Sequence, residues 1–526
     1  MLPLYPRREG DCLLGDGLRQ DEPIFEVPEV GEVEENPVLR GQGQGGIRTH
    51  VYGSRAIGDN PSAARSGHLG LTFLRSGRVR VAIVIALPVQ SSSGTFASLF
   101  DADTRAAISS GLCIQCRGAK LLCGKARCPI LVRWDSMMKT APMIDRVDLD
   151  GSSPPGVFVG RFGYPKVFVG PLVPPVHGDT EILDSPEEWV GHPMEDIVRF
   201  RSTLVRGMHR VHVGDVDRGG RIVDLTRELA LGTSPAEVEV GFARKPQGRV
   251  VLDDNVQPFG PSAPLRRLDV GTLKVDARLD RAYSDTDLRA KEAVLDLFGH
   301  GLPVSKIQRA FSVGAFGFEK NRRFVPTRWS ITAVDDTIGK DLRETVKKKP
   351  LINEVRVYEA IGYDDRFLII MVPRPWRYEL IEAWYPNTLW NPLGQEVVMF
   401  GDHEGFEGRT TYASIGGCYY AARLAVGEAL LREGRQAATV ILRETHPGYI
   451  MPVGVWNVRE HVRAALRQLP HRFPTMREAL AHLASRLDIP MERYVRMSEG
   501  LQHVLYQRTF DDYPLIGPGG LELGSS

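Results

Sequence analysis

The sequence predicts an α+β protein of several parts, in which hairpins and helices mix without regular strand–helix–strand alternation. Three observations support this class. The segment Val-Phe-Val-Gly occurs twice, ten residues apart, around a Gly/Pro-rich turn, which is typical of a hairpin. Residues 417–433 have a helical pattern ending at Gly434, and Thr475-Met-Arg-Glu478 is a capping box that begins another helix. A length of 526 residues suggests about three units.

Composition excludes several classes of protein. Lys and Arg total 66 and Asp and Glu total 65, so a net charge of +1 excludes a globally basic nucleic-acid binder but not a local basic patch. The longest apolar run, Val81–Val89, contains a proline and is far shorter than the ~20 residues of a membrane helix. Six cysteines are too few for a disulfide framework in a chain this long. We therefore expect a protein of the reducing cytoplasm with no membrane partner.

The first 105 residues differ from the rest. They show no sustained strand or helix period, and Met137 is the first methionine after Met1. Ile47-Arg48-Thr49 can be encoded by ATT-CGA-ACC, the reverse complement of a transfer-RNA T-arm consensus. Two interpretations stay open: a disordered tail, or a spurious extension from a start codon placed too far upstream. Beyond it we expect a cysteine-rich module at 106–150, two core parts at 151–345 and 346–470, and a C-terminal helix and tail at 471–526.

The elements follow in chain order from local signals. The first hairpin spans 156–170, and Pro186 with neighbouring acids indicates a helix start at 184–188. Period-2 patterns and turn residues predict the remaining strands, and apolar spacing predicts the remaining helices. The predicted strands are 237–243, 249–252, 355–360, 366–372 and 438–442, and the predicted helices are 284–298, 417–433 and a last one from 475 that stops before Pro490.

Four cysteines within sixteen residues are the strongest chemical signal. Cys113, Cys116, Cys123 and Cys128 can supply four thiolates to a tetrahedral metal, so we expect one structural zinc in a C4 knuckle. Glycines that follow the ligand pairs permit the tight turns of metal knuckles. An Fe–S cluster is the alternative cofactor, because Cys128-Pro129 resembles the end of ferredoxin motifs. Unpaired structural cysteines are the third interpretation.

The cysteine segment is also basic. Between Cys113 and Arg133 there is no acidic residue, whereas Arg117, Lys120, Lys125 and Arg127 all lie in it. Such a patch in a nearly neutral protein favours phosphate contacts of a nucleic acid. The alternatives are that the cations offset thiolate charge or form a solvated face. In the turn of the first hairpin, Arg161 and Lys166 flank Tyr164 and form a second candidate nucleic-acid site. The alternative for this turn is a rigid element with a solvated tip.

Several motifs together resemble a known family. They are Cys113-Ile-Gln-Cys-Arg-Gly118, Val157-Phe-Val-Gly-Arg-Phe-Gly-Tyr-Pro-Lys-Val167, Gly170-Pro-Leu-Val-Pro174, Phe200-Arg-Ser-Thr-Leu-Val-Arg-Gly207 and Pro258-Phe-Gly-Pro-Ser-Ala-Pro-Leu265. This combination, from about residue 109 to 513, resembles the archaeal Nre family of DNA repair proteins, NreA type. The resemblance implies a C4-type zinc finger with the four cysteines above as ligands, a role in the DNA damage response, and docking on the sliding clamp PCNA.

A clamp-binding motif is matched only in part. Such motifs have the pattern Gln-x-x-aliphatic-x-x-aromatic-aromatic, and the nearest match consists of Gln507, Phe510 and Tyr513, followed by Pro514. Phe510 stands at the aliphatic position and Pro514 at the second aromatic one. The alternative is that Phe510 and Tyr513 anchor the tail to the core of the protein.

No motif identifies a reaction, and the catalytic residues are unknown. The run Asp402-His403-Glu404, with Glu407 and Arg409, can serve acid–base chemistry or a second metal, or it is an exposed charged loop. Cys418 at a helix start is either an activated thiol or a core cysteine. The sequence favours a DNA repair factor without catalytic activity. A nuclease-like DNA-processing enzyme and a zinc-knuckle RNA-binding accessory protein remain alternatives.

Overall fold

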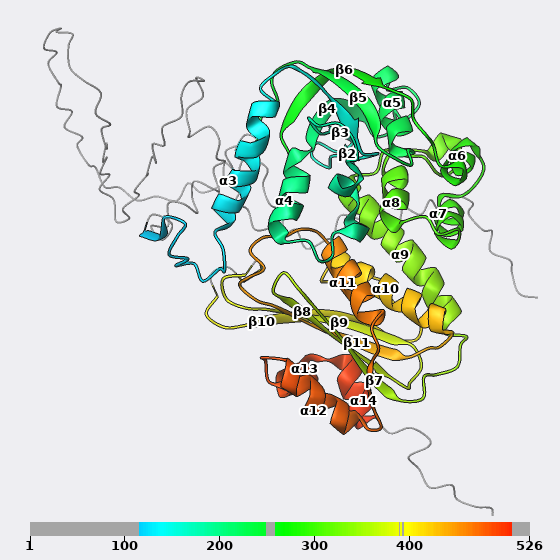
Figure 1. Ribbon diagram of the computed structural model, residues 1–526. Helices are drawn as coiled ribbons and strands as arrows, with labels where there is room; N and C mark the ends of the chain where they lie inside the picture. Colours follow the sequence, from blue (N-terminus) through cyan, green and yellow to red (C-terminus); the bar gives the residue numbers. More distant parts are fainter. Residues whose placement is uncertain (1–114, 249–257, 389, 392–393, 508–526) are drawn as a thin grey trace, which may run out of the picture.

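The computed structural model describes residues 115–248, 258–388, 390–391 and 394–507, so the predicted extension at 1–105 lies outside the described residues. Two mixed sheets form the molecule, with α9 (Thr327–Val346), α10 (Gly417–Glu433) and α11 (Trp456–Leu466) between them (Figure 1). Helices α12 (Met476–Arg486), α13 (Met491–Met497) and α14 (Glu499–Tyr506) cover the far face of the second sheet. The predicted α+β class is confirmed.

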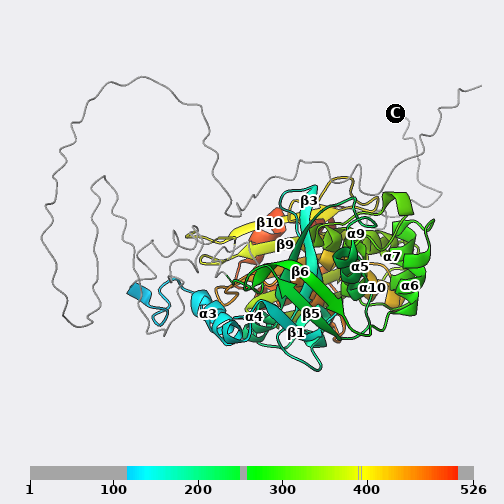
Figure 2. The same cartoon turned by 90° about the horizontal axis from the view of Figure 1, so that it is seen from above.

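The first sheet comes from the first half of the described chain. Within the described residues it has six strands in the order β1-β5-β6-β4-β3-β2, and only β4 and β6 run parallel. Figure 2 shows the sheet from above, with α3 and α4 beside it. Its strands are β1 (Asp148–Ser153), β2 (Val157–Val159), β3 (Lys166–Val173), β4 (Val205–His212), β5 (Ala236–Phe242) and β6 (Ser262–Val270).

The predicted hairpin at 156–170 is β2 and β3. Val157 pairs with Pro171 and Val159 with Val169 in antiparallel register, which confirms it. Strand β5 matches the predicted strand 237–243, but its described neighbours are β1 and β6. The predicted partner strand 249–252 lies outside the described residues.

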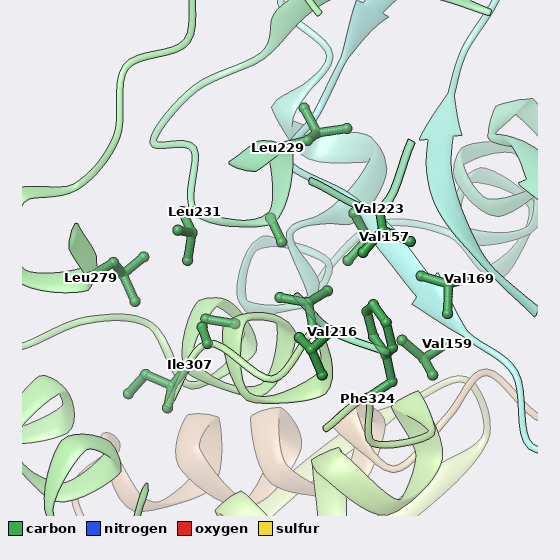
Figure 3. Packing of buried hydrophobic residues seen from close by; sticks show 14 of the residues in the cluster. Val157, Val159, Val169, Val216, Val223, Leu229, Leu231, Leu279, Ile307 and Phe324 are labelled. Carbon is green, nitrogen blue, oxygen red and sulfur yellow. The ribbon is translucent and has the colours of Figure 1, made fainter. Parts of the chain in front are cut away.

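The core of the first half fills the space between this sheet and its helices (Figure 3). Val157, Val159 and Val169 of the hairpin pack in one buried cluster with Val223 of α5 and Ile307 of α8. Because alternate residues of a strand point to opposite faces, the same pattern leaves Lys166 and Phe168 of β3 exposed. The helices of this half are α3 (Pro129–Thr140), α4 (Met194–Thr203), α5 (Arg221–Ala230), α6 (Ala277–Ser284), α7 (Ala290–Gly299) and α8 (Val304–Ser312).

Two predicted helix starts are wrong in detail. The helix expected over 284–298 begins at Ala290, after a turn in which the Asp285 carboxylate accepts the N–H groups of Asp287 and Leu288. A carboxylate that satisfies nearby amides competes with helix formation. The start expected at 184–188 forms only the 3-10 turns η3 (Glu181–Asp184) and η4 (Pro186–Glu188). Two further 3-10 turns are η2 (Ala141–Met143) and η5 (Glu319–Asn321).

The inner strands of the second sheet are buried on both faces. Its six strands within the described residues have the order β10-β9-β11-β8-β7-β12, and only β9 and β11 run parallel. Every residue of β11 is buried, because helices cover both sides of the strand. The strands are β7 (Val355–Gly362), β8 (Asp365–Val372), β9 (Arg377–Trp384), β10 (Val398–Glu404), β11 (Ala438–Thr445) and β12 (His471–Phe473).

Local signals in this half are confirmed. Tyr363 and Asp364 both have positive φ in the two-residue turn that joins β7 to β8, as a tight hairpin requires. Gly434 ends α10 in the left-handed conformation, and the Thr475 side chain accepts the N–H of Glu478 at the start of α12. Of the helices in the described parts of the chain, none has the length and apolarity needed to cross a membrane.

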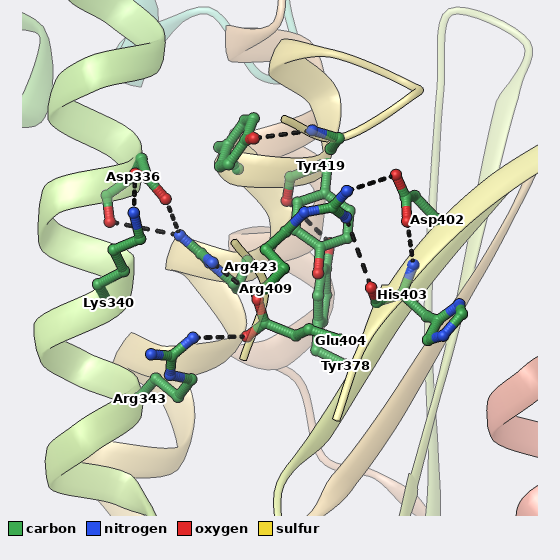
Figure 4. A network of polar contacts seen from close by, with 12 residues as sticks. Asp336, Lys340, Arg343, Tyr378, Asp402, His403, Glu404, Arg409, Tyr419 and Arg423 are labelled. Atoms are coloured by element: carbon green, nitrogen blue, oxygen red, sulfur yellow. Dashed lines mark hydrogen bonds and ion pairs between the residues drawn. The ribbon is translucent and has the colours of Figure 1, made fainter. Parts of the chain in front are cut away.

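Buried ion pairs connect helix α9 to helices and strands of the second half of the molecule (Figure 4). The fully buried guanidinium of Arg423 on α10 donates to Glu404 of β10 at 2.8 Å and to Asp336 of α9 at 2.5 Å. One residue earlier on α9, the buried Asp335 carboxylate accepts Arg459 of α11 at 3.1 and 3.2 Å. Charges without water must be paired, so these contacts fix where α9 lies against α10 and α11.

We predict that Arg423→Met strongly destabilises the protein, because it leaves the Glu404 carboxylate buried without its main partner. The expected loss in the free energy of unfolding is about 3–5 kcal/mol. The matched control is Lys139→Met, which breaks an exposed i,i+4 pair with Asp135 and should cost less than about 1 kcal/mol. Urea unfolding monitored by circular dichroism measures both. Equal and small losses in the two variants would contradict the role assigned to Arg423.

Candidate nucleic-acid interface

The described part of the cysteine segment, residues 115–128, is a chain of tight turns. Arg117, Gly118, Leu121 and Gly124 all have positive φ, and the N–H groups of Ala119 and Lys120 both donate to the carbonyl of Cys116. Positive φ is cheap for glycine and costs energy for Arg117 and Leu121, so tertiary contacts must hold this segment in shape.

Backbone amides also surround the buried Cys116 side chain. The N–H of Leu122 has the largest effect in lowering the pKa of the Cys116 thiol; burial opposes it, and the N–H groups of Gly118, Lys120 and Leu121 add to the lowering. A thiol whose pKa is lowered more readily becomes the thiolate that binds metals. Cys128 directly precedes α3, and its Sγ lies 3.6 Å from the position that a Cβ on Gly118 would occupy. Cys113 lies outside the described residues.

The segment is held against both halves of the fold. The Lys125 ammonium donates to the carbonyl of Asn387, at 2.9 Å, in the loop after β9. Arg127 pairs with Glu195 of α4. Arg117, Lys120 and Arg127 are exposed, and of these Arg117 and Lys120 have no ion pair with the described part of the protein. Lys125 and Arg127 each form a contact within the protein, to Asn387 and Glu195.

The second predicted site lies on the β2–β3 hairpin. Lys166 begins β3 and is exposed, and Arg161 is half-buried with its guanidinium 5.0 Å from the centre of the Phe162 ring. The Tyr164 ring packs on Trp329 of α9, with centroids 5.2 Å apart. Contacts of this hairpin tip thus go to α9, whereas the cysteine segment contacts α4 and the loop after β9. The two predicted sets lie on different elements of the fold.

The predicted clamp motif is described only at its first residue. Gln507 is exposed directly after the end of α14, while Phe510 and Tyr513 lie outside the described residues. The motif therefore starts where the last helix leaves the far face of the second sheet.

The polar run at 402–409 is structural, and its interpretation as an exposed loop is wrong. Asp402 and Glu404 belong to strand β10 (Figure 4). Asp402 accepts Arg409 at 2.8 Å and the N–H of Ser414 at 2.6 Å, and Glu404 is paired with Arg423. Both carboxylates are thus engaged in holding β10 and the following turn to α10. Cys418 is half-buried and packs against the core of the second half, and burial raises the pKa of its thiol, which favours the core interpretation.

Sequence reasoning missed one cluster of potential ligands. Ligand atoms of Glu444, His446 and Asp488 all lie within 4.8 Å of one another, with the Tyr385 ring stacked on His446 at 4.3 Å. The residues come from a strand end and from the loop after α12, so no local spacing connects them. The Arg366 guanidinium, 3.4 Å from both carboxylates, already supplies a positive charge there.

The charges around His446 act together on its titration. Burial alone would lower the pKa of His446, but the Glu444 carboxylate 3.6 Å away and the charges of Asp364 and Asp488 outweigh it and raise the pKa. A protonated His446 fits between the acids as a second cation beside Arg366. The cluster is therefore a balanced ionic group that ties the loop after α12 to the end of β11.

Together, the fold and these surfaces define an α+β protein that carries a basic, cysteine-rich segment on one side and a basic hairpin on another. The model of the Archaeal Nre N-terminal region matches residues 122–391, and that of the Archaeal Nre C-terminal region matches residues 404–513. The chain belongs to the archaeal Nre family, as its motifs predict. No solved structure matches the chain.

Three relatives have curated names. DNA repair protein NreB of Archaeoglobus fulgidus is 41% identical over 400 residues, which cover 75% of this chain and 99% of that protein. DNA repair protein NreA of the same organism is 34% identical over 72% of this chain and 94% of its own length. DNA repair protein NreA of Haloferax volcanii is 35% identical over 67% of this chain and 87% of its own length.

Proposed function

We propose that this protein acts in DNA repair by binding DNA through the cysteine-rich segment. The relatives that it matches over most of their length are DNA repair proteins. The observation that carries the proposal is the segment itself: it has no acidic residue between Cys113 and Arg133 and exposes Arg117 and Lys120 to solvent. Cations in such an arrangement suit phosphate contacts, which give affinity without reading sequence. Lys125 and Arg127 add charge beside them.

Zinc is the cofactor that we propose for the four cysteines, because four thiolates suit a tetrahedral ion. Among the described residues, the ligand atoms of Cys116, Cys123 and Cys128 do not all lie within 4.8 Å of one another, so the ion would have to draw them together. Cys113, Cys116, Cys123 and Cys128 would hold it, and the ion would stabilise a segment too short to have a core of its own. Two observations support the fit: amide N–H groups surround the Cys116 side chain, and left-handed turns occur at Gly118 and Gly124. An Fe–S cluster is the alternative for the same four thiolates.

The hairpin tip is the second proposed DNA contact. Arg161 and Lys166 lie on a rigid turn whose base is anchored by a hydrogen bond from the Val159 N–H to the Thr327 hydroxyl, at 2.9 Å. A cation on a fixed element loses less conformational entropy on binding than one on a flexible tail.

We also propose docking on PCNA through Gln507, Phe510 and Tyr513. Gln507 supports this proposal because it is exposed and directly follows α14. Residues spaced three apart lie on one side of a helical turn, so all three can face one groove of a clamp.

The zinc proposal predicts about one zinc ion per chain. Cys116→Ser should lose most of the metal and lower the thermal stability of the cysteine segment, because one ligand of four is removed. Cys418→Ser, a change at the core cysteine of α10, is the control and should keep the zinc. Metal analysis by mass spectrometry measures both. Brown protein that contains iron and labile sulfide would instead establish an Fe–S cluster.

The DNA proposal predicts a change in salt dependence. In the double variant Arg117→Gln/Lys120→Gln, the slope of the logarithm of the DNA-binding constant against the logarithm of the salt concentration should flatten by about 0.7–0.9 for each lost phosphate contact. The pair Lys125→Gln with Arg127→Gln should flatten it less, since Asn387 and Glu195 already engage these side chains. Titration of labelled duplex DNA at several salt concentrations measures the slopes. Unchanged slopes in both pairs would exclude the cysteine segment as the DNA contact.

The clamp proposal predicts that Phe510→Ala with Tyr513→Ala abolishes retention of the protein on immobilised PCNA. Zinc content and melting temperature should stay as in the wild type, because a docking motif is exposed in the free protein. Tyr506→Ala, an exposed aromatic one turn earlier, is the control. A clearly lower melting temperature of the double variant would show instead that the two aromatics anchor the tail to the core.

A further inference from the structure

The β2–β3 hairpin exposes three aromatic side chains close together in sequence. Phe162 is 41% exposed, Tyr164 47% and Phe168 37%. Single exposed apolar side chains are common on protein surfaces, but three aromatics on one hairpin are a feature of interaction sites. Three exposed rings on a well-packed hairpin suit a ligand with flat apolar faces.

Cations accompany these rings at short range. The Arg210 guanidinium lies 5.9 Å from the centre of the Phe168 ring, and its NH2 group lies 3.7 Å from where a Cβ on Gly163 would be. Arg210 therefore reaches from β4 to the turn of the hairpin. Lys166 stands on the same face as Phe168, two residues along β3, and is exposed. We call Phe162, Tyr164, Phe168, Lys166 and Arg210 the hairpin face.

Acidic residues are missing from the strands that form this face. Residues 156–178 and 197–214, which contain β2, β3 and β4, include no Asp or Glu in the sequence. The cations of the hairpin face are therefore not balanced by acids of their own strands. Charge complementarity points to an anionic ligand, and the aromatic rings require that this ligand also has planar apolar groups.

Buried residues on the opposite side of the strands support the hairpin face. Val167, Val169 and Val211 point to the opposite side of the strands and are fully or almost fully buried in the core. The Tyr164 ring rests on Trp329, which fixes the tip of the hairpin against α9. A rigid platform of aromatic rings binds with little loss of side-chain entropy.

We propose that the hairpin face binds unpaired nucleotides of single-stranded DNA, with bases stacked on Phe162, Tyr164 and Phe168 and phosphates beside Lys166 and Arg210. Base stacking on aromatic side chains needs bases whose faces are free, and a duplex keeps these faces inside its own stack. The inference rests on the proposed DNA-binding function and adds the class of DNA. The cysteine segment contacts phosphates of either form, whereas the hairpin face selects the unpaired one.

The test compares the full-length protein with Phe162→Ala/Phe168→Ala, using labelled oligothymidine, duplex DNA and single-stranded RNA of equal length. The wild type should bind the single strand more tightly than the duplex. The double variant should lose about tenfold or more in single-strand affinity and leave duplex affinity unchanged. Tyr506→Ala, which removes an exposed aromatic from α14, is the matched control and should change neither. Quenching of tryptophan fluorescence reports contact near Trp329.

A second variant keeps the test decisive if the double variant folds poorly. Lys166→Gln with Arg210→Gln preserves the aromatic rings and should weaken single-strand binding with a flatter salt slope. Unchanged single-strand affinity in both variants would contradict the proposal that the hairpin face binds single-stranded DNA. It would not contradict DNA binding through the cysteine segment. Tighter binding of RNA than of DNA would reassign the ligand to RNA. Absence of binding to every DNA probe would overturn the proposed function itself.

Discussion

The relative position of the two halves depends on buried charge. Asp335 and Asp336, adjacent on α9, accept arginines that project from α11 and α10, and these arginines are withdrawn from water. An unpaired charge in such a place is costly, so a shift of one helix past the other would break several pairs at once. Helix α9 carries this constraint to the surface as well. Its first turn contacts the hairpin through Thr327 and Trp329, so the same helix that joins the halves also positions the hairpin face.

The cysteine segment takes its position from both halves. Lys125 reaches the loop after β9 and Arg127 reaches α4, so the segment bridges elements that are far apart in sequence. Gly124 lies against the side chain of Asn387, where a Cβ would come within 2.8 Å of the amide nitrogen. A substitution at Gly124 would thus disturb both the left-handed turn and the docking. This arrangement leaves Arg117 and Lys120 exposed to solvent.

Local sequence signals predicted local structure well. The β2–β3 hairpin, the glycine end of α10 and the capped start of α12 each depend on a few neighbouring residues, and each is found. Long-range structure left no such signal: the parallel pairing of β9 with β11 and the ion pairs of Arg423 join distant residues. The run around Asp402 resembled a loop because paired, buried carboxylates have the composition of exposed ones. The sequence shows which cations lie near the cysteines, but only the fold shows that Lys125 and Arg127 contact Asn387 and Glu195 and that Phe168 is exposed on β3.

The C-terminal helices and the β2–β3 hairpin lie on different sheets of the molecule. Helices α12 to α14 lie on the face of the second sheet that points away from the first sheet, and Gln507 leaves the fold there (Figure 1). A partner that held the chain by its tail would leave the hairpin of the first half uncovered. Tethering of this kind raises the effective concentration of a second site near the same strand, with no new contact required. Two weak binding sites at opposite ends of the molecule would then act as one bivalent site of higher avidity. Dissociation of either site would lower that avidity and allow the protein to dissociate.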